Sequence, residues 1–191
     1  MKTPSLRSDP MQIARLLQAE SVSGKLPPVH LWNPPFCGDL DMEIKRNGQW
    51  FYLGTPIGRP ALVKLFSSVL RLDDDGCHYL VTPVEKVRIR VEDAPFLVTT
   101  VERLLRDDEP FLQFTTLTGD IIVAGPDHPI RLVYRGDEPS PYVPVRAGLQ
   151  ALIHRNVYYQ LIDWGVPGPC DGERETLVVR SGGQDFVIGH F

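Results

Sequence analysis

Residues 54–70 read GTPIGRPALVKLFSSVL, which is the pattern of a turn that opens a helix. Glycine and proline punctuate its first half, and Pro60 suits the first turn of a helix, where a missing backbone N–H removes no hydrogen bond. Apolar residues then recur at helical spacing, at Leu62, Leu65, Phe66, Val69 and Leu70. The stretch therefore predicts a helix that begins near Arg59 and has one face in a core.

A looser copy of this pattern occurs in the second half of the chain. Tyr142–Arg146 is similar to Tyr52–Arg59 when a one-residue gap aligns Arg146 with Arg59. An apolar stripe follows, made of Leu149, Leu152, Ile153, Val157 and Leu161. We therefore expect a second helix over residues 146–164 and a duplicated architecture, in which each half is built as hairpin, helix and hairpin.

The composition is that of an ordinary globular protein. The chain has 191 residues, of which 42% are hydrophobic and 23% charged, and its formal net charge is −4. This length allows one large core or two small ones, and the lack of a basic excess argues against DNA as a partner. No apolar run is long enough for a signal peptide or a membrane span. Cys37, Cys77 and Cys170 lack the spacing of a disulfide framework or a zinc site. We expect a cytoplasmic protein with no membrane partner, no cofactor and no metal.

Turn signals and alternating residues place strands around the two helices. Ser8 or Asp9 is expected to cap a short N-terminal helix with Pro10 in its first turn. The Asn47-Gly48 dipeptide predicts a hairpin within residues 42–53, and residues 78–82 and 87–91 predict another. In the second half, strands are predicted over residues 96–105, 111–116, 120–124 and 129–134, with a closing hairpin over 176–180 and 186–188.

These elements predict an α+β fold of duplicated units, whose antiparallel sheets each carry one main helix. Residues 1–26 are expected to form an N-terminal helical arm and linker. Residues 27–93 form the first α+β domain in this interpretation, and residues 94–191 the second. The change of domain is placed at the polar step before Ala94-Pro95.

A set of short motifs runs through residues 27–163. It comprises Cys37-Gly38-Asp39, Asn47-Gly48-x-Trp50-x-Tyr52-x-Gly54-x-Pro56-Ile57-x-Arg59, Leu80-Val81-Thr82-Pro83-Val84-Glu85-Lys86, Val91-Glu92-Asp93-Ala94-Pro95-Phe96, Asp127-His128-Pro129 and Arg155-x-Val157-Tyr158-Tyr159. Together these motifs resemble the DUF1285 family of bacterial proteins of unknown function, although Thr116 stands where the family is expected to have Asn. The resemblance implies a duplicated α+β fold whose C-terminal part is superficially like a pleckstrin-homology domain. It also implies a site between the domains for a nucleotide-like molecule in signalling.

Arg59 and Arg146 are candidate ligand-binding residues, because each is expected at the start of a helix. A helix N-terminus presents free N–H groups and partial positive charge, and a guanidinium adds a fork that suits phosphate or carboxylate. We expect Arg131 and Arg155 to join them around one groove. The alternative is that each helix-start arginine pairs with an acidic residue across the domain boundary.

Aromatic residues form a second group of candidates. Trp50, Tyr52, Tyr142, Tyr158 and Tyr159 cluster in the sequence around the two helices, and a flat base could stack on such rings. Trp50, Tyr52 and Tyr158 are the rings proposed for the ligand site. The alternative is core or interface packing, with the hydroxyls hydrogen-bonded at the edge.

Enzymatic motifs are weak in this sequence. Gly54-x-x-x-Gly58-Arg59 lacks the Lys-Ser or Lys-Thr of a P-loop, Asp73–Gly76 does not match a calcium loop, and the five histidines have no metal-ligand spacing. Asp127-His128 and the Asp39/Asp41 pair are the candidates for acid–base chemistry. Their structural alternatives are a capped turn and an ion pair with Arg59.

The sequence favours a non-catalytic ligand-binding or sensing protein, which binds an anionic, nucleotide-like small molecule between its two domains. A protein–protein adaptor is the second hypothesis, and a metal-independent hydrolase is the third.

Overall fold

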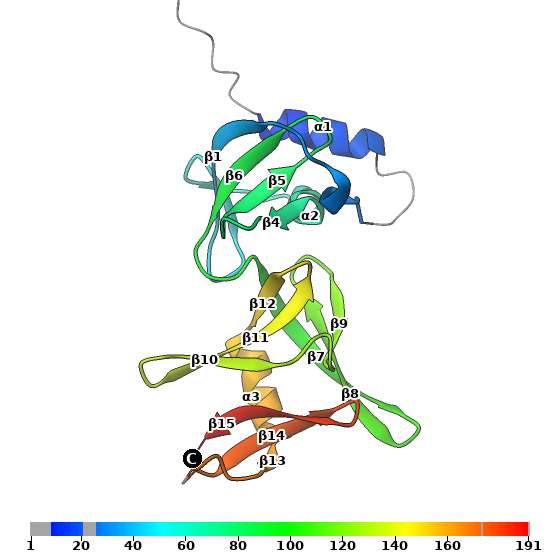
Figure 1. Ribbon diagram of the computed structural model, residues 1–191, viewed down its shortest axis with the longest axis vertical. Helices are drawn as coiled ribbons and strands as arrows, with labels where there is room; N and C mark the ends of the chain where they lie inside the picture. The colour runs from blue at the N-terminus through cyan, green and yellow to red at the C-terminus, as the bar shows by residue number, and fades with distance from the viewer. Residues whose placement is uncertain (1–8, 21–25, 173, 191) are drawn as a thin grey trace, which may run out of the picture. The chain divides into compact units, whose positions relative to one another are not determined.

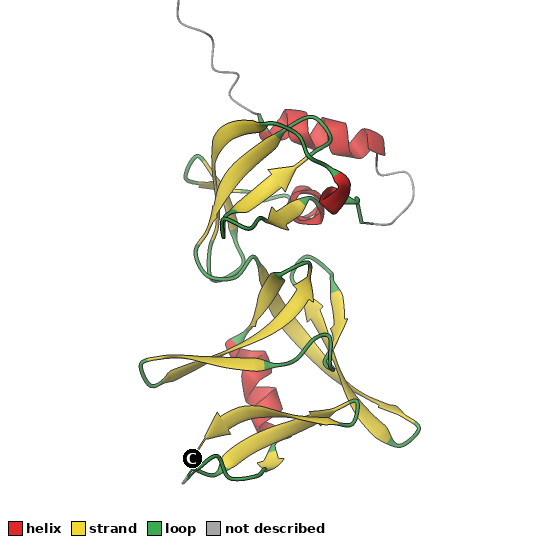
Figure 2. Cartoon of the chain, viewed as in Figure 1, coloured by secondary structure: helices red, strands yellow, loops and turns green. Residues whose placement is uncertain are grey.

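The computed structural model describes residues 9–20, 26–172 and 174–190. The chain divides into two compact units, and the division falls between Glu92 and Asp93 (Figure 1). Strands outnumber helices among the described residues, with one main sheet in each unit and a smaller sheet in the second (Figure 2).

The first unit contains two α-helices and six strands among its described residues. The helices are α1 (Pro10–Glu20) and α2 (Pro60–Ser68), and a short 3-10 helix, η1 (Val29–Leu31), precedes the sheet. The strands are β1 (Phe36–Ile44), β2 (Trp50–Tyr52), β3 (Thr55–Pro56), β4 (Leu70–Leu72), β5 (His78–Val81) and β6 (Lys86–Val91). The predicted hairpin at Asn47-Gly48 is confirmed, since β1 pairs with β2 in antiparallel fashion. The predicted helix that follows Arg59 is confirmed as α2.

The N-terminal helix begins where the sequence indicates. The Asp9 carboxylate accepts a hydrogen bond from the Met11 amide at 2.9 Å, which is the bond that an N-cap residue makes. Ser8, the other predicted cap, lies outside the described residues. Ile13 and Leu17 are buried, and α1 contacts α2, so the arm is packed on the first unit.

The second unit holds the remaining described elements. Its main sheet is formed by β7 (Phe96–Arg106), β8 (Glu109–Thr116), β9 (Ile121–Val123), β10 (Arg131–Arg135), β11 (Glu138–Arg146) and β12 (Leu149–Ile153). Helix α3 (Arg155–Asp163) follows, and the small sheet consists of β13 (Val166–Pro167), β14 (Thr176–Ser181) and β15 (Gln184–His190). The predicted closing hairpin is confirmed as β14 and β15.

The duplication lies in the order of the strands. The first sheet has the order β3-β2-β1-β6-β5-β4, and the second, taken from the corresponding edge, has the order β9-β8-β7-β12-β11-β10. In each of these two sheets, the strands that come first and last along the chain pair in parallel, β1 with β6 and β7 with β12. The predicted α+β class and duplicated architecture are therefore confirmed, with sheets that are mixed rather than wholly antiparallel.

The helices do not follow the duplication. Helix α2 stands between β3 and β4, whereas α3 comes after β12. The prediction of a helix from Arg146 is wrong, because Arg146 ends β11 and a tight turn leads directly into β12. Ala147 and Gly148 form that turn with φ angles of 45° and 78°. Arg59 and Arg146 are thus not equivalent positions.

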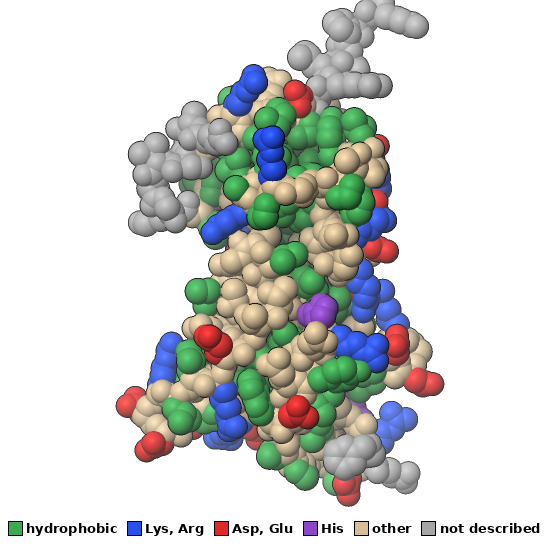
Figure 3. All heavy atoms as spheres, turned by 180° about the vertical axis from the view of Figure 1, so that it is seen from behind, with side chains coloured by type: hydrophobic (Ala, Val, Ile, Leu, Met, Phe, Trp, Pro, Cys, Tyr) green, Lys and Arg blue, Asp and Glu red, His purple; other side chains and the backbone are tan. Residues whose placement is uncertain are grey.

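Each unit has its own core. In the first, Phe66 of α2 packs against Trp50 of β2, and Met42, Ile44 and Leu80 are fully buried. In the second, Ala94, Leu97, Tyr142 and Leu152 form one buried cluster. On the face drawn in Figure 3, acidic and basic side chains are interspersed rather than gathered into one large patch.

Candidate functional site

A groove with a volume of about 260 Å³ lies between α1 and α2 of the first unit. Its walls are made by Met11, Ala14, Ala61, Leu62 and Leu65, and two arginines, Arg15 and Arg59, also line it. On α1 the lining residues are three and four positions apart, so they form one stripe along the helix. We call this feature the α1–α2 groove.

Arg59 occupies the N-cap position of α2, as the sequence predicts. Its backbone is extended, with φ −109° and ψ 103°, and no side chain caps the helix. The Arg59 carbonyl oxygen accepts hydrogen bonds from the amides of Leu62 at 3.0 Å and Val63 at 3.2 Å. Pro60 has no amide hydrogen, so Ala61 supplies the open backbone donor of this first turn. Because the helix start offers so few amides, an anion here would be held mainly by guanidinium groups.

The charge of the α1–α2 groove comes from its two arginines. The side chains of Arg15 and Arg59 are exposed, and neither side chain makes an ion pair or hydrogen bond with another described residue. Elsewhere in the unit, Arg71 pairs with Asp73 and Arg88 pairs with Asp39. The α1–α2 groove thus combines aliphatic walls with two available guanidinium groups. The sequence prediction included Arg59 but missed Arg15, because the packing of α1 on α2 is a tertiary contact.

Arg146, by contrast, has an acidic partner. It donates to the Asp120 carboxylate, and its guanidinium carbon lies 4.7 Å from the centre of the Phe96 ring. Burial acts to raise the pKa of Asp120, but hydrogen bonds from Thr118 and Thr116 and the charge of Arg146 outweigh it and lower that pKa below the ordinary value of 3.8. Asp120 is therefore charged at neutral pH, and it neutralises Arg146 within the second unit.

The other two predicted arginines lie apart from this pair. Arg131 is exposed on β10, opposite Tyr142 of β11. Arg155 begins α3, where its Nε donates to the Tyr159 hydroxyl at 2.6 Å. Arg131 lies on β10, Arg146 ends β11 and Arg155 begins α3. Arg59 belongs to the first unit and these three belong to the second, so a groove shared by all four stays a prediction.

The predicted aromatic residues have structural surroundings. Trp50 is 2% exposed, and its ring stacks on Phe66 with the centroids 6.3 Å apart. Tyr158 is 8% exposed and donates its hydroxyl hydrogen to the Ile188 carbonyl at 2.6 Å. Tyr52 is half-buried on β2, opposite Thr55. None of these three rings lines the α1–α2 groove.

The acid–base candidates are also engaged. His128 donates from Nδ1 to the Pro144 carbonyl oxygen at 2.8 Å, and its own amide donates to the Gly125 carbonyl. Asp39 and Asp41 pair with Arg88 and Arg90 of β6, not with Arg59. Among the described residues there is no group of three or more side chains arranged to hold a metal ion.

The chain is similar to known families and solved structures. Residues 27–94 match the family model for the N-terminal domain of DUF1285, a domain of unknown function. Residues 95–188 match the family model for the C-terminal domain of DUF1285. The crystal structure of a DUF1285 family protein from Silicibacter pomeroyi DSS-3 is 49% identical with a TM-score of 0.78, over 90% of this chain and 93% of that one. The DUF1285 family protein from Shewanella baltica OS155 is 34% identical with a TM-score of 0.52, over 65% of this chain and 91% of that one. No curated protein matches.

No helix among the described residues has both the length and the apolar character that a membrane span requires.

Proposed function

The chain belongs to the DUF1285 family across both of its domains, and on this premise we propose that it is a non-catalytic protein that binds an anionic small molecule in the α1–α2 groove. The observation that carries the proposal is the position of Arg15 and Arg59. Both line an aliphatic groove, and neither has an acidic partner among the described residues.

The chemistry of the groove selects the class of ligand. Guanidinium groups bind carboxylate and phosphate oxygens through two parallel hydrogen bonds. Leu62 and Leu65 are half-buried, so a ligand that covers them removes apolar surface from water. The ligand therefore has an anionic head and an apolar or flat body. The nucleotide-like molecule that the family resemblance implies is one member of this class, and its base would lie against the two leucines.

The engaged state of the acid–base candidates supports binding without turnover. The His128 ring is held by a backbone carbonyl, and the carboxylates of Asp39 and Asp41 are held by arginines. Binding without chemical change is what a sensing protein requires.

The test is isothermal titration of the full chain with two kinds of probe, adenosine monophosphate and decanoate. The first carries phosphate on a flat body, and the second carries carboxylate on an aliphatic one. We expect at least one probe to bind, and we expect Arg59→Gln to weaken it by at least about tenfold, since a lost charge-assisted hydrogen bond is worth about 1.4 kcal/mol or more.

Arg131→Gln is the matched control, because the Arg131 side chain is also exposed and makes no ion pair or hydrogen bond with a described residue. It should leave the affinity unchanged. Equal weakening by the two substitutions, or no binding of either probe, would refute the proposal.

A further inference from the structure

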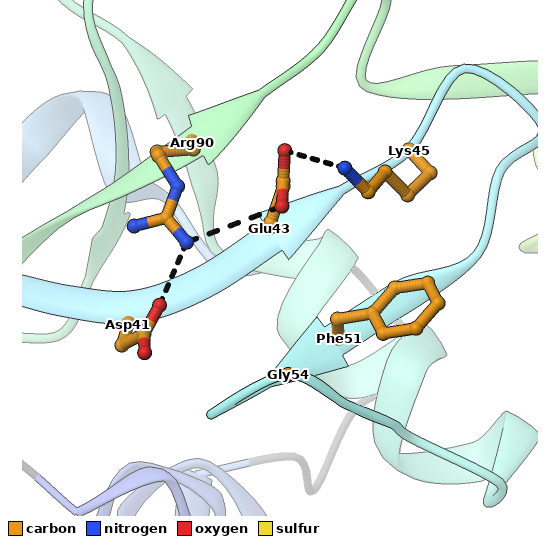
Figure 4. Close-up of a pocket in the computed structure, with 6 residues that line it drawn as sticks. All are labelled: Asp41, Glu43, Lys45, Phe51, Gly54 and Arg90. Carbon is orange, nitrogen blue, oxygen red and sulfur yellow. Dashed lines mark hydrogen bonds and ion pairs between the residues drawn. The ribbon is translucent and has the colours of Figure 1, made fainter.

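A second hollow, with a volume of about 420 Å³, lies on one face of the first sheet and shares no lining residue with the α1–α2 groove. Figure 4 shows its walls. Its lining residues come from three neighbouring strands and the segments next to them. Asp41 and Glu43 lie on β1, and Lys45 directly follows that strand; Phe51 lies on β2, Gly54 in the turn after β2, and Arg90 on β6. Asp41 and Glu43 are two apart on a strand, so they project on the same side, away from the buried Met42 between them. We call this feature the sheet pocket.

The charged groups of the sheet pocket form a connected row. Arg90 donates from Nη2 to the Asp41 carboxylate at 2.7 Å, and the same nitrogen lies 4.0 Å from Glu43. Glu43 uses its other oxygen to accept from Lys45 at 2.9 Å. Two carboxylates and two cations therefore face one cavity, and their formal charges cancel.

Asp41 and Arg90 can each make further hydrogen bonds besides these. The Arg90 side chain is 61% exposed and the Asp41 side chain 50%. The second oxygen of Asp41 and the remaining guanidinium nitrogens of Arg90 have no partner among the described residues. A free acceptor and free donors thus lie side by side at one end of the pocket, and the half-buried Phe51 lies opposite Glu43 on the neighbouring strand, away from Asp41 and Arg90 (Figure 4).

We propose that the sheet pocket binds a small zwitterion of the α-amino-acid type, with an ammonium group, a carboxylate and an apolar side chain. The ammonium is held by Asp41 and Glu43, the carboxylate by Arg90 and Lys45, and the apolar side chain lies on Phe51. A purely anionic ligand would face the two carboxylates, and a purely cationic one would face Arg90 and Lys45. A ligand that carries both charges can place its ammonium near the carboxylates and its carboxylate near the cations, so that no charge is left unpaired.

The neighbouring ion pair provides a matched control. Asp39 and Arg88 lie on the same two strands and are joined by two hydrogen bonds of 2.7 and 2.9 Å. They have the chemistry of the Asp41–Arg90 pair but do not line the pocket. A purely structural role for cross-strand ion pairs would make the two pairs behave alike.

The experiment is titration of the full chain with L-leucine, with L-leucinamide, which lacks the carboxylate, and with N-acetyl-L-leucine, which lacks the ammonium. L-Leucine should bind at least about tenfold more tightly than either analogue. Arg90→Gln and Asp41→Asn should each weaken leucine binding by at least about tenfold, whereas Arg88→Gln and Asp39→Asn should not change it. The thermal unfolding midpoint of each variant is measured as well, and it identifies any variant that has lost its fold. Arg90→Lys keeps the positive charge and should retain part of the affinity for leucine.

The proposal is overturned if leucine does not bind, if either analogue binds as tightly as leucine, or if the Asp39–Arg88 substitutions weaken binding as much as the Asp41–Arg90 ones. Arg59→Gln should leave leucine binding unchanged, so this result and the result for the α1–α2 groove can be judged separately.

Discussion

The Tyr142 hydroxyl lies 2.8 and 2.9 Å from the two carboxylate oxygens of Asp93 and donates its hydrogen to them. The Asp93 side chain is 5% exposed, and it also accepts a hydrogen bond from Arg135 at 2.7 Å. Asp93 is the first residue of the second unit, so this contact fastens the start of the unit to β11 of its own sheet.

Replacing Tyr142 by phenylalanine removes a hydrogen bond to a buried charge. We expect the free energy of unfolding to fall by about 1.5–3 kcal/mol, measured by urea denaturation. Tyr134→Phe is the control, since Tyr134 is exposed and bonds to His190 at 2.8 Å. Equal losses from the two substitutions would contradict the importance given to the Asp93 contact.

Asp120 should make stability depend on pH. Its pKa is lowered in the folded protein from the ordinary value of 3.8, so its stabilising effect is complete above about pH 4 and is lost as the pH falls through the lower, folded-state value. Asp120→Asn should therefore cost about 1.5–3 kcal/mol at neutral pH, and the difference from the parent should narrow in acid.

Urea unfolding at about pH 7 and about pH 3 measures this difference. Asp74→Asn is the control, because Asp74 is exposed and has no ion pair among the described residues. A gap between parent and Asp120→Asn that stays constant with pH would show that the carboxylate charge is not what stabilises this site.

Ser181 should be important for holding the small sheet on the main sheet of the second unit. It is fully buried, donates to the Ala124 carbonyl at 2.7 Å and accepts from the Leu112 amide at 2.9 Å. Ser181→Ala leaves both backbone groups without this partner. We expect the free energy of unfolding to fall by about 2–6 kcal/mol, because each of the two unsatisfied buried groups costs about 1–3 kcal/mol.

The comparison for that measurement is Ser68→Ala. Ser68 bonds to Leu65 within its own helix at 2.6 Å, so its removal should cost far less. If the two substitutions lower the unfolding midpoint equally, the Ser181 bridge does not hold the sheets together.

The turn between β11 and β12 should be improved by one substitution. Ala147 has a φ of 45° and precedes Gly148 at 78°, and a left-handed conformation costs a non-glycine residue about 1–2 kcal/mol. Asparagine tolerates that conformation, and Asn-Gly is the preferred pair for such a hairpin turn. Ala147→Asn should raise the free energy of unfolding by up to about 1 kcal/mol, because it relieves part of that cost, and Gly148→Ala should lower it. A destabilised Ala147→Asn protein would contradict this account of the turn.

Much of the fold could be predicted from local sequence. The hairpin at Asn47-Gly48, the cap at Asp9 and the helix after Pro60 follow from signals that act within a few residues. The prediction of a helix from Arg146 was wrong, and the reason is also local. Leu149, Ala151 and Ile153 are all buried on a strand, and together with Leu152 their spacing fits a helix equally. Ala147 is a strong helix former, so its presence favoured the prediction of a helix where the chain makes a turn.

Less of the candidate site could be predicted from the sequence. The sequence indicated Arg59 as a candidate, but Arg15 became a partner through the packing of α1 on α2. Arg146 looked equivalent to Arg59 until the structure placed Asp120 beside it. Whether a charged side chain has a partner depends on residues far away in the chain, which no local pattern specifies.

The sequence by itself determined the family, the α+β class, the duplication and most strand positions, because turn chemistry and alternation act over short distances. Only the tertiary structure decided the strand order, the exact start of the last helix, and which arginines are neutralised. Those outcomes depend on which distant segments pair and pack, so they are set by the free energy of the whole fold and not by any single stretch of it.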